Sequence, residues 1–431
     1  MRFYTNINRF QNKLYIVGYD NSKPFYHIER FQPELFLLSK EHSEYKNPDN
    51  QYLKKLDFES MSEASKFGRE YSGIEGYDIY GTSDWVSQYI IKNYPKELNY
   101  NIKELRIFFF DIEVNSSNGF PEPEFANEPV TAISLYDNKL DKIIVFANKD
   151  YKVKDSDVIY KKFENEELLL FDFVSYWKDN MPNIVSGWNS LRFDMPYIIN
   201  RLEKLTGNNK LGSNLSPFKK YQKQTTKNRI TGKEDEIYEI FGVSQLDYLD
   251  LFKKYSPKQM VSYKLDHIGE EIVGEKKVEY EGSLHELYEN DYEKFIDYSI
   301  QDTRLLKKID AKMKLIDLII SISYLAGLPC YEDVFGVLKM WENIIYRDMY
   351  YNKVIDKFER VVKSKTKKYE GAFVKTPIKS KAEWIVSEDF ASYYPLTIVQ
   401  NNIGWETLVT KDKLMKNYNE IRKEMKKRLD K

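Results

Sequence analysis

The chain of 431 residues contains a single cysteine, Cys330, and only four histidines. One cysteine cannot form an internal disulfide, which is typical of a protein kept in the reducing cytoplasm. The histidines are scattered and have no cysteine partners, so a structural zinc site is not expected. They are His27, His42, His267 and His285. These shortages exclude a disulfide scaffold and argue against a zinc-stabilised fold.

Long apolar runs are also lacking. Residues 1–9 are polar and have no apolar segment of the kind found in a signal peptide. The most apolar long stretch, residues 315–328, is interrupted by Asp317 and two serines. It falls short of the ~20 apolar residues that span a bilayer. We therefore expect a buried helix at this position, and a soluble protein without a membrane partner.

Charge of either sign is not in excess, because 66 Lys and Arg balance 67 Asp and Glu to a formal charge of −1. A nucleic-acid partner would therefore have to be attracted by local basic patches. Hydrophobic residues make up 42% of the chain and aromatic residues 15%, which is ample for globular folding. The length predicts two to four domains.

Strand and helix patterns alternate along most of the chain. Residues 13–19 and 25–29 are predicted strands, and residues 60–71 and 85–94 are predicted helices. From residue 105 onward, strands are predicted at 107–110, 130–135, 142–146 and 183–186, and helices at 166–178, 196–205 and within 291–322. This alternation indicates an α/β, or mixed α+β, multidomain protein with a β-rich N-terminal part.

The stretch from Phe108 to Glu113 carries the most information. Its apolar run predicts a buried strand, and in a strand the carboxylates of Asp111 and Glu113 point to the same side. Two like charges repel each other unless a cation lies between them, and Mg²⁺ or Mn²⁺ is the usual cation for oxygen ligands. Taken alone, the pair is weak evidence, and a solvated strand end is the more common explanation of such a pair.

Two further acidic positions accompany this pair. Asp194 stands just before a predicted helix, where a helix N-cap is the simpler interpretation. Tyr298 and Asp302 are spaced i, i+4 and share one face of a predicted helix. A surface hydrogen-bonding pair would explain that spacing as well.

Together, Asp111, Glu113, Asp194 and Asp302 could surround two divalent ions about 3.5–4 Å apart. One ion would lower the pKa of a bound water, and the other would stabilise a leaving 3′ oxygen. Tyr298 could orient the attacking water by a hydrogen bond. The four acids therefore predict phosphodiester hydrolysis with little covalent chemistry by the protein itself.

Three segments resemble the exonuclease motifs of DnaQ-like 3′–5′ proofreading nucleases. They are Asp111-Ile112-Glu113, Asn189 followed by Phe193-Asp194, and Tyr298 followed by Asp302. More narrowly, the chain resembles the N-terminal part of a family B DNA polymerase from the large tailed bacteriophages, to which residues 119–123, 246–251 and 262–266 are also similar. The resemblance implies an RNase H-like exonuclease fold, two Mg²⁺ or Mn²⁺ ions, and proofreading of DNA 3′ ends.

Residues 387–395 resemble polymerase motif A. The resemblance implies that Asp389 binds the catalytic Mg²⁺ and that Tyr394, with Ser392 and Tyr393 beside it, contacts the incoming nucleotide. A buried aromatic strand ending in a turn is the structural alternative. Leu396 departs from the family, which commonly has serine there.

Other segments imply contacts with DNA. The resemblance assigns Tyr369 and Gly371 to a loop that handles the primer strand, and Asn189 and Phe193 to the exonuclease site. Phe120 could stack on a base, or simply pack under its loop. The basic residues 219–233 match the place of a strand-separating hairpin, or form a solvated loop.

Polymerase motifs B and C do not follow Asp389. Leu414, Tyr418, Ile421, Met425 and Leu429 predict an amphipathic helix that resembles the first fingers helix. We therefore hypothesise a split polymerase whose second chain carries motifs B and C. Alternatives are a truncated piece of a longer chain, a stand-alone exonuclease with a vestigial palm, and a non-catalytic nucleic-acid-binding regulator.

This interpretation predicts three parts: an N-terminal domain at 1–104 with a returning segment at 315–358, an exonuclease domain at 105–314, and the start of a palm at 359–431. The implied partners are single-stranded and primer–template DNA, a dNTP in the completed polymerase, and the second chain with a sliding clamp through it. The implied location is the cytoplasm, that of the host cell if the protein is viral.

Overall fold

The structure is a computed structural model that describes residues 1–72, 74, 76–115, 119, 121–227, 234–358, 376, 383–384, 386, 388–404, 407, 418–420 and 422–423. It contains two compact units, one formed by residues 1–32 and 84–347 and the other by residues 33–83 and 348–431. The predicted boundaries near residues 104, 314 and 358 stay a prediction.

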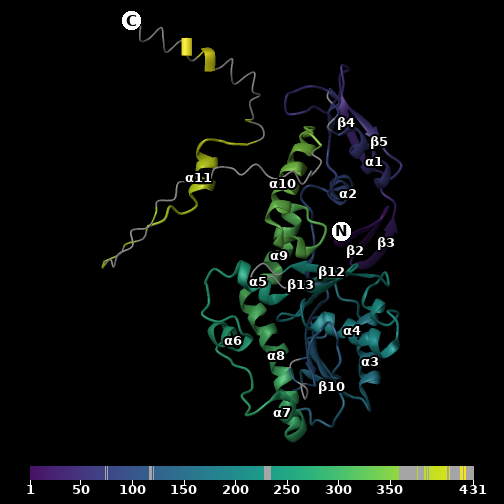
Figure 1. The fold of residues 1–431 in the computed structure, drawn as a ribbon, viewed down its shortest axis with the longest axis vertical. Helices are drawn as coiled ribbons and strands as arrows, with labels where there is room; N and C mark the ends of the chain where they lie inside the picture. The colour runs from purple at the N-terminus through teal and green to yellow at the C-terminus, as the bar shows by residue number, and fades with distance from the viewer. Residues whose placement is uncertain are drawn as a thin grey trace. The chain divides into compact units, whose positions relative to one another are not determined.

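A six-stranded mixed sheet forms the centre of the larger unit (Figure 1). Its strands are ordered β10 (Val158–Lys162), β9 (Lys142–Ala147), β8 (Val130–Asp137), β7 (Ile107–Val114), β11 (Ile184–Ser186) and β14 (Ser244–Gln245). Strands β9, β8 and β7 pair antiparallel, and β11 and β14 join β7 in parallel. The predicted alternation of strands and helices, and with it the α/β fold class, is confirmed.

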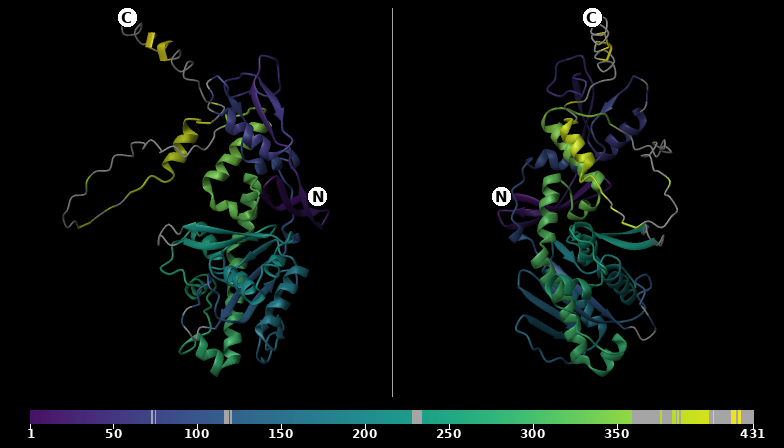
Figure 2. Two further views of the ribbon diagram at one scale, coloured as in Figure 1. Left: turned by 45° about the vertical axis from the view of Figure 1, so that its right-hand side comes forward. Right: turned by 90° about the vertical axis from the view of Figure 1, so that its left-hand side faces the viewer.

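The two faces of β7 carry different residues. Phe108, Phe110 and Ile112 belong to an apolar core that includes residues of α3 (Glu166–Asp179) and α4 (Asp194–Thr206). The opposite face packs against α8 (Tyr292–Met313), where the Ser134 hydroxyl of β8 donates to the Ser299 carbonyl at 2.8 Å. Figure 2 shows α8 running along the sheet. Because side chains alternate along a strand, the two acids of β7 face α8.

Further elements of this unit surround the sheet. An N-terminal sheet consists of β1 (Arg2–Phe10), β2 (Lys13–Asp20) and β3 (Lys23–Glu29), followed later by α2 (Trp85–Asn93) and a short helix η1 (Ile102–Glu104). The hairpin β12 (Tyr221–Lys227) and β13 (Glu234–Ile240) follows η2 (Gly212–Leu215). Helices α5 (Tyr248–Tyr255), α6 (Leu265–Val273), α7 (Leu284–Asn290), α9 (Leu315–Ala326) and η3 (Tyr331–Phe335) complete it, and α10 (Val337–Tyr351) begins in it.

The helical stretch predicted within residues 291–322 consists of two helices. Lys314 has a positive φ of 54° and ends α8 in the left-handed region, so α9 starts in a new direction. The sequence has no glycine at this position that would have marked the break. The short helices α5, α6 and α7 were not predicted, since each offers too few turns for a clear periodic pattern.

The smaller unit contains a sheet ordered β5 (Leu53–Asp57), β4 (Glu34–Leu38) and β6 (Ile79–Tyr80). Phe36, Leu53, Tyr80 and Ile355 form its buried core. Its helix α1 (Met61–Tyr71) begins after the predicted N-cap, because the Ser60 hydroxyl accepts from the Glu63 amide at 3.2 Å. Helix α11 (Tyr393–Gln400) is assigned to the same unit.

Within the ranges that the structure describes, no helix combines the length and the apolar character needed to cross a membrane. Helix α9, which contains most of the apolar stretch noted in the sequence, has only 12 residues, and seven of its side chains are buried in the protein. The prediction of a buried helix at this position is confirmed.

Candidate active site

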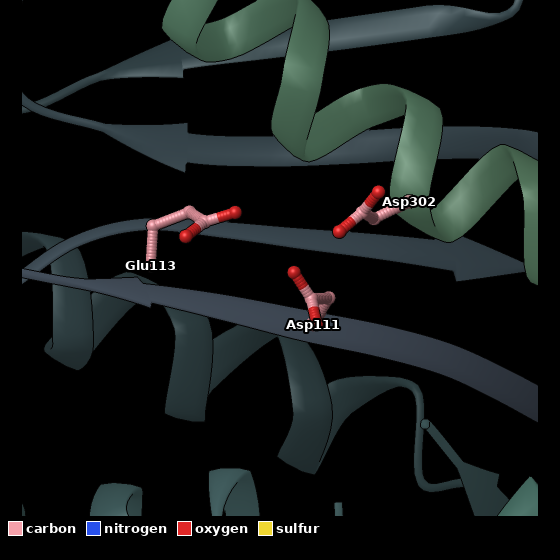
Figure 3. A group of neighbouring side chains, drawn as sticks. All are labelled: Asp111, Glu113 and Asp302. Carbon is pink, nitrogen blue, oxygen red and sulfur yellow. The ribbon is translucent and has the colours of Figure 1, made fainter. Parts of the chain in front are cut away.

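Three of the four predicted acids converge on the face of the sheet that α8 covers. Asp111, Glu113 and Asp302 each contribute a carboxylate oxygen, and these oxygens lie within 4.8 Å of one another. Figure 3 shows the two acids of β7 directed toward Asp302 on α8. Glu113 and Asp302 are only 5% and 3% exposed. No other group of three or more acids, histidines or cysteines among the described residues has this geometry.

Two carboxylate oxygens of this cluster have no hydrogen-bond donor. Glu113 Oε1 and Asp302 Oδ1 are both buried and both lack a partner in the structure. Buried polar atoms are nearly always paired, because leaving one unpaired costs about 1–3 kcal/mol. Unpaired carboxylate oxygens in one cluster are therefore suited to a cation, and carboxylates are the ligands that Mg²⁺ and Mn²⁺ prefer.

Asp194 reaches the same strand from the other side. It is the first residue of α4, is 3% exposed, and its Oδ1 accepts a hydrogen bond from the Ile112 amide at 3.0 Å. Its side chain does not cap its own helix, so the N-cap interpretation is not what the structure shows. Asp194 lies outside the group of three carboxylates.

Lys277 contacts the acidic cluster, although nothing in the sequence indicated this contact. Its ammonium group donates to Asp302 Oδ2 and, at 3.0 Å, to the Tyr298 hydroxyl. The segment Glu275-Lys276-Lys277 reads in sequence like an ordinary charged loop. Only the packing of this loop against α8 shows that Lys277 is directed into the acidic cluster, while its side chain remains 26% exposed.

The electrostatics of the cluster follow from burial and from like charges. Burial, and then the nearby Asp302 charge, raise the pKa of Glu113 to about 8 against the opposing effect of Lys277. Burial, and then the charges of Glu113 and Asp194, raise the pKa of Asp111. Burial also raises the pKa of Asp194 to about 7, although the Ile112 amide opposes this rise. Because the pKa values of these acids are raised, protons compete with a divalent cation for their oxygens.

The same buried charges shift the pKa values of Lys277 and Tyr298. Burial opposes the charged form of Lys277, but Asp302, Tyr298 and Asp111 outweigh it and raise the pKa of Lys277. Burial, followed by the charges of Asp302 and Glu113, raises the pKa of Tyr298. Tyr298 therefore stays protonated and can act as a hydrogen-bond donor at neutral pH.

Asp247 fixes the loop that leads to Asp194. Its Oδ1 accepts from the Asn189 amide and its Oδ2 from the Leu191 amide, both at 3.1 Å. Asn189 has a positive φ of 70°, a conformation that asparagine tolerates better than most residues. Phe193 packs against Tyr197, with ring centroids 5.8 Å apart. Both predicted DNA-binding residues of this motif thus lie on a backbone that is held in place.

Comparison with known proteins agrees with this geometry. Residues 85–268 match the exonuclease domain of DNA polymerase family B. The DNA-directed DNA polymerase of Escherichia phage RB69 is 33% identical over 377 residues, which cover 81% of this chain and 41% of that protein. That of Enterobacteria phage T4 is 31% identical over 415 residues, which cover 90% and 45%.

The chain belongs to the family B DNA polymerases. It is also 26% identical over 320 residues to the DNA polymerase of Pyrococcus glycovorans, across 71% of this chain and 38% of that protein. The chain thus spans less than half the length of these relatives. The predicted RNase H-like exonuclease fold is confirmed, with the acidic cluster on its central strand.

The residues predicted from polymerase motif A lie in the smaller unit of this family B chain. Asp389 precedes α11, and Ser392, at its N-cap, has a positive φ of 53°. Tyr393 and Tyr394 are 59% and 75% exposed, so the alternative of a buried aromatic strand is wrong. The cluster of three acids does not include Asp389. Its role in binding metal stays a prediction.

Several predicted residues lie outside the described part of the chain. These are Phe120, Tyr369 and Gly371, residues 228–233 of the basic segment, and Leu414, Ile421, Met425 and Leu429 of the amphipathic stripe. The two strands that flank residues 228–233 are described and pair antiparallel, from Tyr221 with Ile240 to Lys227 with Glu234. The hairpin interpretation of the basic segment is therefore confirmed, while its role on DNA stays a prediction.

Proposed function

We propose that the acidic cluster is the active site of a 3′–5′ exonuclease that hydrolyses the terminal phosphodiester bond of DNA. The observation that carries this proposal is the convergence of Asp111, Glu113 and Asp302 in a buried site with unpaired oxygens. The family B exonuclease domain supports the same conclusion. In hydrolysis, water adds to phosphorus, the 3′ oxygen leaves with a proton, and a nucleoside monophosphate is released.

Asp111, Glu113, Asp302 and Asp194 would hold Mg²⁺ or Mn²⁺ ions, and the donor set fits because it consists of carboxylate oxygens only. Two such ions, when bound, supply charge stabilisation to the attacking and leaving oxygens. Glu113 and Asp302 provide the oxygens that lack a protein donor.

Tyr298 and Lys277 have roles that depend on their hydrogen bonds. The Tyr298 hydroxyl accepts from Lys277, so its own proton can be donated to Asp302 or to the attacking water. Lys277 also neutralises part of the charge on Asp302. The ring of Tyr280 packs edge-on against that of Tyr298 at 5.4 Å and limits its rotation. The pair thus holds a proton donor at a fixed place beside the acids.

The experiment is Mg²⁺-dependent digestion of a 5′-labelled single strand of DNA. We expect a ladder that shortens one nucleotide at a time from the 3′ end, and no ladder in EDTA. The double variant Asp111→Ala/Glu113→Ala, purified in parallel, should leave the strand intact. Equal degradation by both proteins would identify a contaminating nuclease and remove the proposal.

We further propose that Asp389, with Tyr394 beside it, contributes to a DNA polymerase site that is completed by residues beyond those of this chain. The support is the likeness to phage DNA polymerases, which covers 90% of the chain for the T4 protein. That a second chain supplies motifs B and C, with a dNTP and primer–template DNA as ligands, stays a prediction. Mixing this chain with a candidate partner chain should restore nucleotide incorporation, and Asp389→Ala should abolish it.

Persistent inactivity of every such mixture, together with normal digestion of single strands, would favour a stand-alone exonuclease. Absence of both activities, with DNA binding retained, would favour a non-catalytic regulator. The buried acids argue against a regulator, because unpaired carboxylates this close together destabilise a site that has no use for a cation.

A further inference from the structure

The strand that carries the acids ends at an irregularity in its pairing. Glu113 pairs with Ala132, whereas Val114 pairs with Val130, so Thr131 is the extra residue of a β-bulge. The Thr131 hydroxyl donates to the Glu113 carbonyl at 3.0 Å. The backbone of Glu113 is therefore tied directly to the bulge. Whatever holds the bulge also sets where the Glu113 carboxylate points.

A buried ion pair between two helices holds this bulge and the residues before it. Arg201 of α4 makes two parallel bonds to Glu166 of α3, at 2.8 and 2.6 Å. Both side chains are nearly buried, with exposed fractions of 10% and 12%. Two-pronged bonds of this kind are the strong and orientationally specific form of an ion pair.

Each partner of the pair also binds the backbone beside the bulge. Arg201 Nη1 donates to the carbonyls of Ala126 and Asn127, at 3.1 and 2.8 Å. Glu166 Oε1 accepts from the Val130 amide at 2.7 Å. The ion pair thus grips the chain at three backbone groups within five residues, immediately before the segment that pairs with Glu113.

The same helix carries a second connection to the acidic strand. α4 begins with Asp194, which accepts from the Ile112 amide. Arg201 follows seven residues later, two turns along the same helix. One rigid helix therefore holds β7 on one side of Glu113 and, through Arg201, the bulge on the other side.

We propose that the Arg201–Glu166 pair is a positioning device that sets the Glu113 carboxylate for metal binding, an inference that rests on the proposed exonuclease function. Neither residue touches the acidic cluster. They act through the backbone of residues 126–131. Supports of this kind typically change metal affinity or activity by ~10–100-fold when they are removed.

A matched control lies at the opposite end of the same two strands. There Asp137, whose side chain is fully buried, pairs with Arg106 at 3.4 Å, next to the pairing of Phe108 with Asp137. This pair joins a buried acid of β8 to the arginine just before β7, at the end of the strand pair opposite to Glu113. Asp137→Asn and Glu166→Gln remove the same charge at similar cost in volume, so they separate loss of stability from loss of positioning.

The experiment uses the full chain and Mn²⁺ alone as the probe. Mn²⁺ affinity is measured by electron paramagnetic resonance, and stability by urea unfolding, for the wild type and for Glu166→Gln, Arg201→Lys and Asp137→Asn. We expect Glu166→Gln and Arg201→Lys, which we call the clamp variants because they alter the Arg201–Glu166 pair, to bind Mn²⁺ ~10-fold or more weakly. Asp137→Asn should lose stability while its Mn²⁺ affinity stays at the wild-type value.

Digestion of single-stranded DNA supplies the second readout. For the two clamp variants, the metal concentration that gives half-maximal rate should rise, and saturating Mn²⁺ should restore most of kcat. If Glu166→Gln does not fold, Arg201→Lys tests the positioning role by itself, since it keeps the charge and loses only the two-pronged geometry.

Unchanged Mn²⁺ affinity in the folded clamp variants, or an equal loss in Asp137→Asn, would overturn the positioning role. A wild-type chain that binds Mn²⁺ but leaves DNA intact would remove the exonuclease proposal. The Mn²⁺ titrations would still test the positioning role of the Arg201–Glu166 pair. A wild-type chain that binds no Mn²⁺ overturns both.

Discussion

Buried acids stand at both ends of the strand pair β7–β8, and they are treated in opposite ways. At one end, Asp137 accepts from the Tyr176 hydroxyl at 2.7 Å and the Lys139 amide at 2.9 Å, and it pairs with Arg106. At the other end, Glu113 and Asp302 face each other with one oxygen apiece unpaired. One end of the strand pair thus holds an acid whose oxygens have hydrogen-bond donors, whereas the other end holds an acid that faces Asp302 of α8 with an oxygen unpaired.

The difference indicates what each end is for. A buried carboxylate surrounded by donors contributes to a unique structure, because its charge is offset by groups that are always present. A set of carboxylates that repel one another stores an unfavourable energy, and a cation that binds there relieves it. Burial of an acid alone does not mark a functional site. Buried carboxylates that lie close together and lack hydrogen-bond donors do.

The largest expected effect is on catalysis. Asp111→Ala/Glu113→Ala should lower the exonuclease rate by ~10³-fold or more, since charge stabilisation worth several kcal/mol is lost. Asp137→Asn should keep the rate per folded molecule. Single-turnover digestion of a labelled strand measures both. A comparable loss of rate in Asp137→Asn would erase the contrast between the two ends.

The next largest effect is on stability, where we expect Asp137→Asn to be the more damaging of the two changes. Asp137→Asn should lower the free energy of unfolding by about 1–3 kcal/mol, because Arg106 loses its buried partner and the Tyr176 hydroxyl loses a charged acceptor. In EDTA, Asp111→Ala/Glu113→Ala should cost little or even stabilise, since it removes mutual repulsion. Urea unfolding of the two variants side by side gives the comparison. A larger loss for the double variant would contradict it.

Lys277 sharpens the comparison, because among the residues that the structure describes it is the cation paired with an acid of the cluster. In EDTA, Lys277→Met should lower the free energy of unfolding by about 1–2 kcal/mol, since Asp302 loses its counter-charge and the Tyr298 hydroxyl a donor. Added Mg²⁺ should recover much of this loss by supplying the missing positive charge. Unfolding with and without Mg²⁺ tests this, and an identical loss in both conditions would count against a cation site.

Glu332 is an intermediate case: one of its buried oxygens is unpaired, but it belongs to no group of three acids with metal-ligand spacing among the described residues. Burial raises the pKa of Glu332 from 4.5 to about 8, although a hydrogen bond with Ser244 opposes the rise. The neutral form is therefore favoured in the folded state, and this contribution to stability is complete below pH 4.5 and lost as pH rises through about 8.

Glu332→Gln cannot ionise, so its stability relative to the wild type should improve by about 2–3 kcal/mol between pH 6 and pH 9. Unfolding free energies at several pH values provide the test. The control is Glu164→Gln, which changes an acid whose side chain lies at the surface. A difference that stays flat with pH would show that Glu332 is not held neutral.

Much of the local structure was predictable because it depends on short-range geometry. The alternation of side chains along a strand places Asp111 and Glu113 on one face wherever residues 107–114 form a strand. The i, i+4 spacing likewise places Tyr298 and Asp302 on one helix face, and Ser60 predicts the start of α1. The resemblance to family B polymerases then indicated that these separate faces meet.

What the sequence by itself determined is the side of each element on which its acids stand. Only the tertiary structure decided the rest: that Lys277 enters the cluster, that Asp194 binds the strand backbone at Ile112 instead of its own helix, and that Arg201 and Glu166 grip the bulge beside Glu113. Each of these contacts joins residues at least 25 positions apart. Local backbone preferences carry no information at such separations, because those contacts arise only when distant elements pack and their polar groups must find partners.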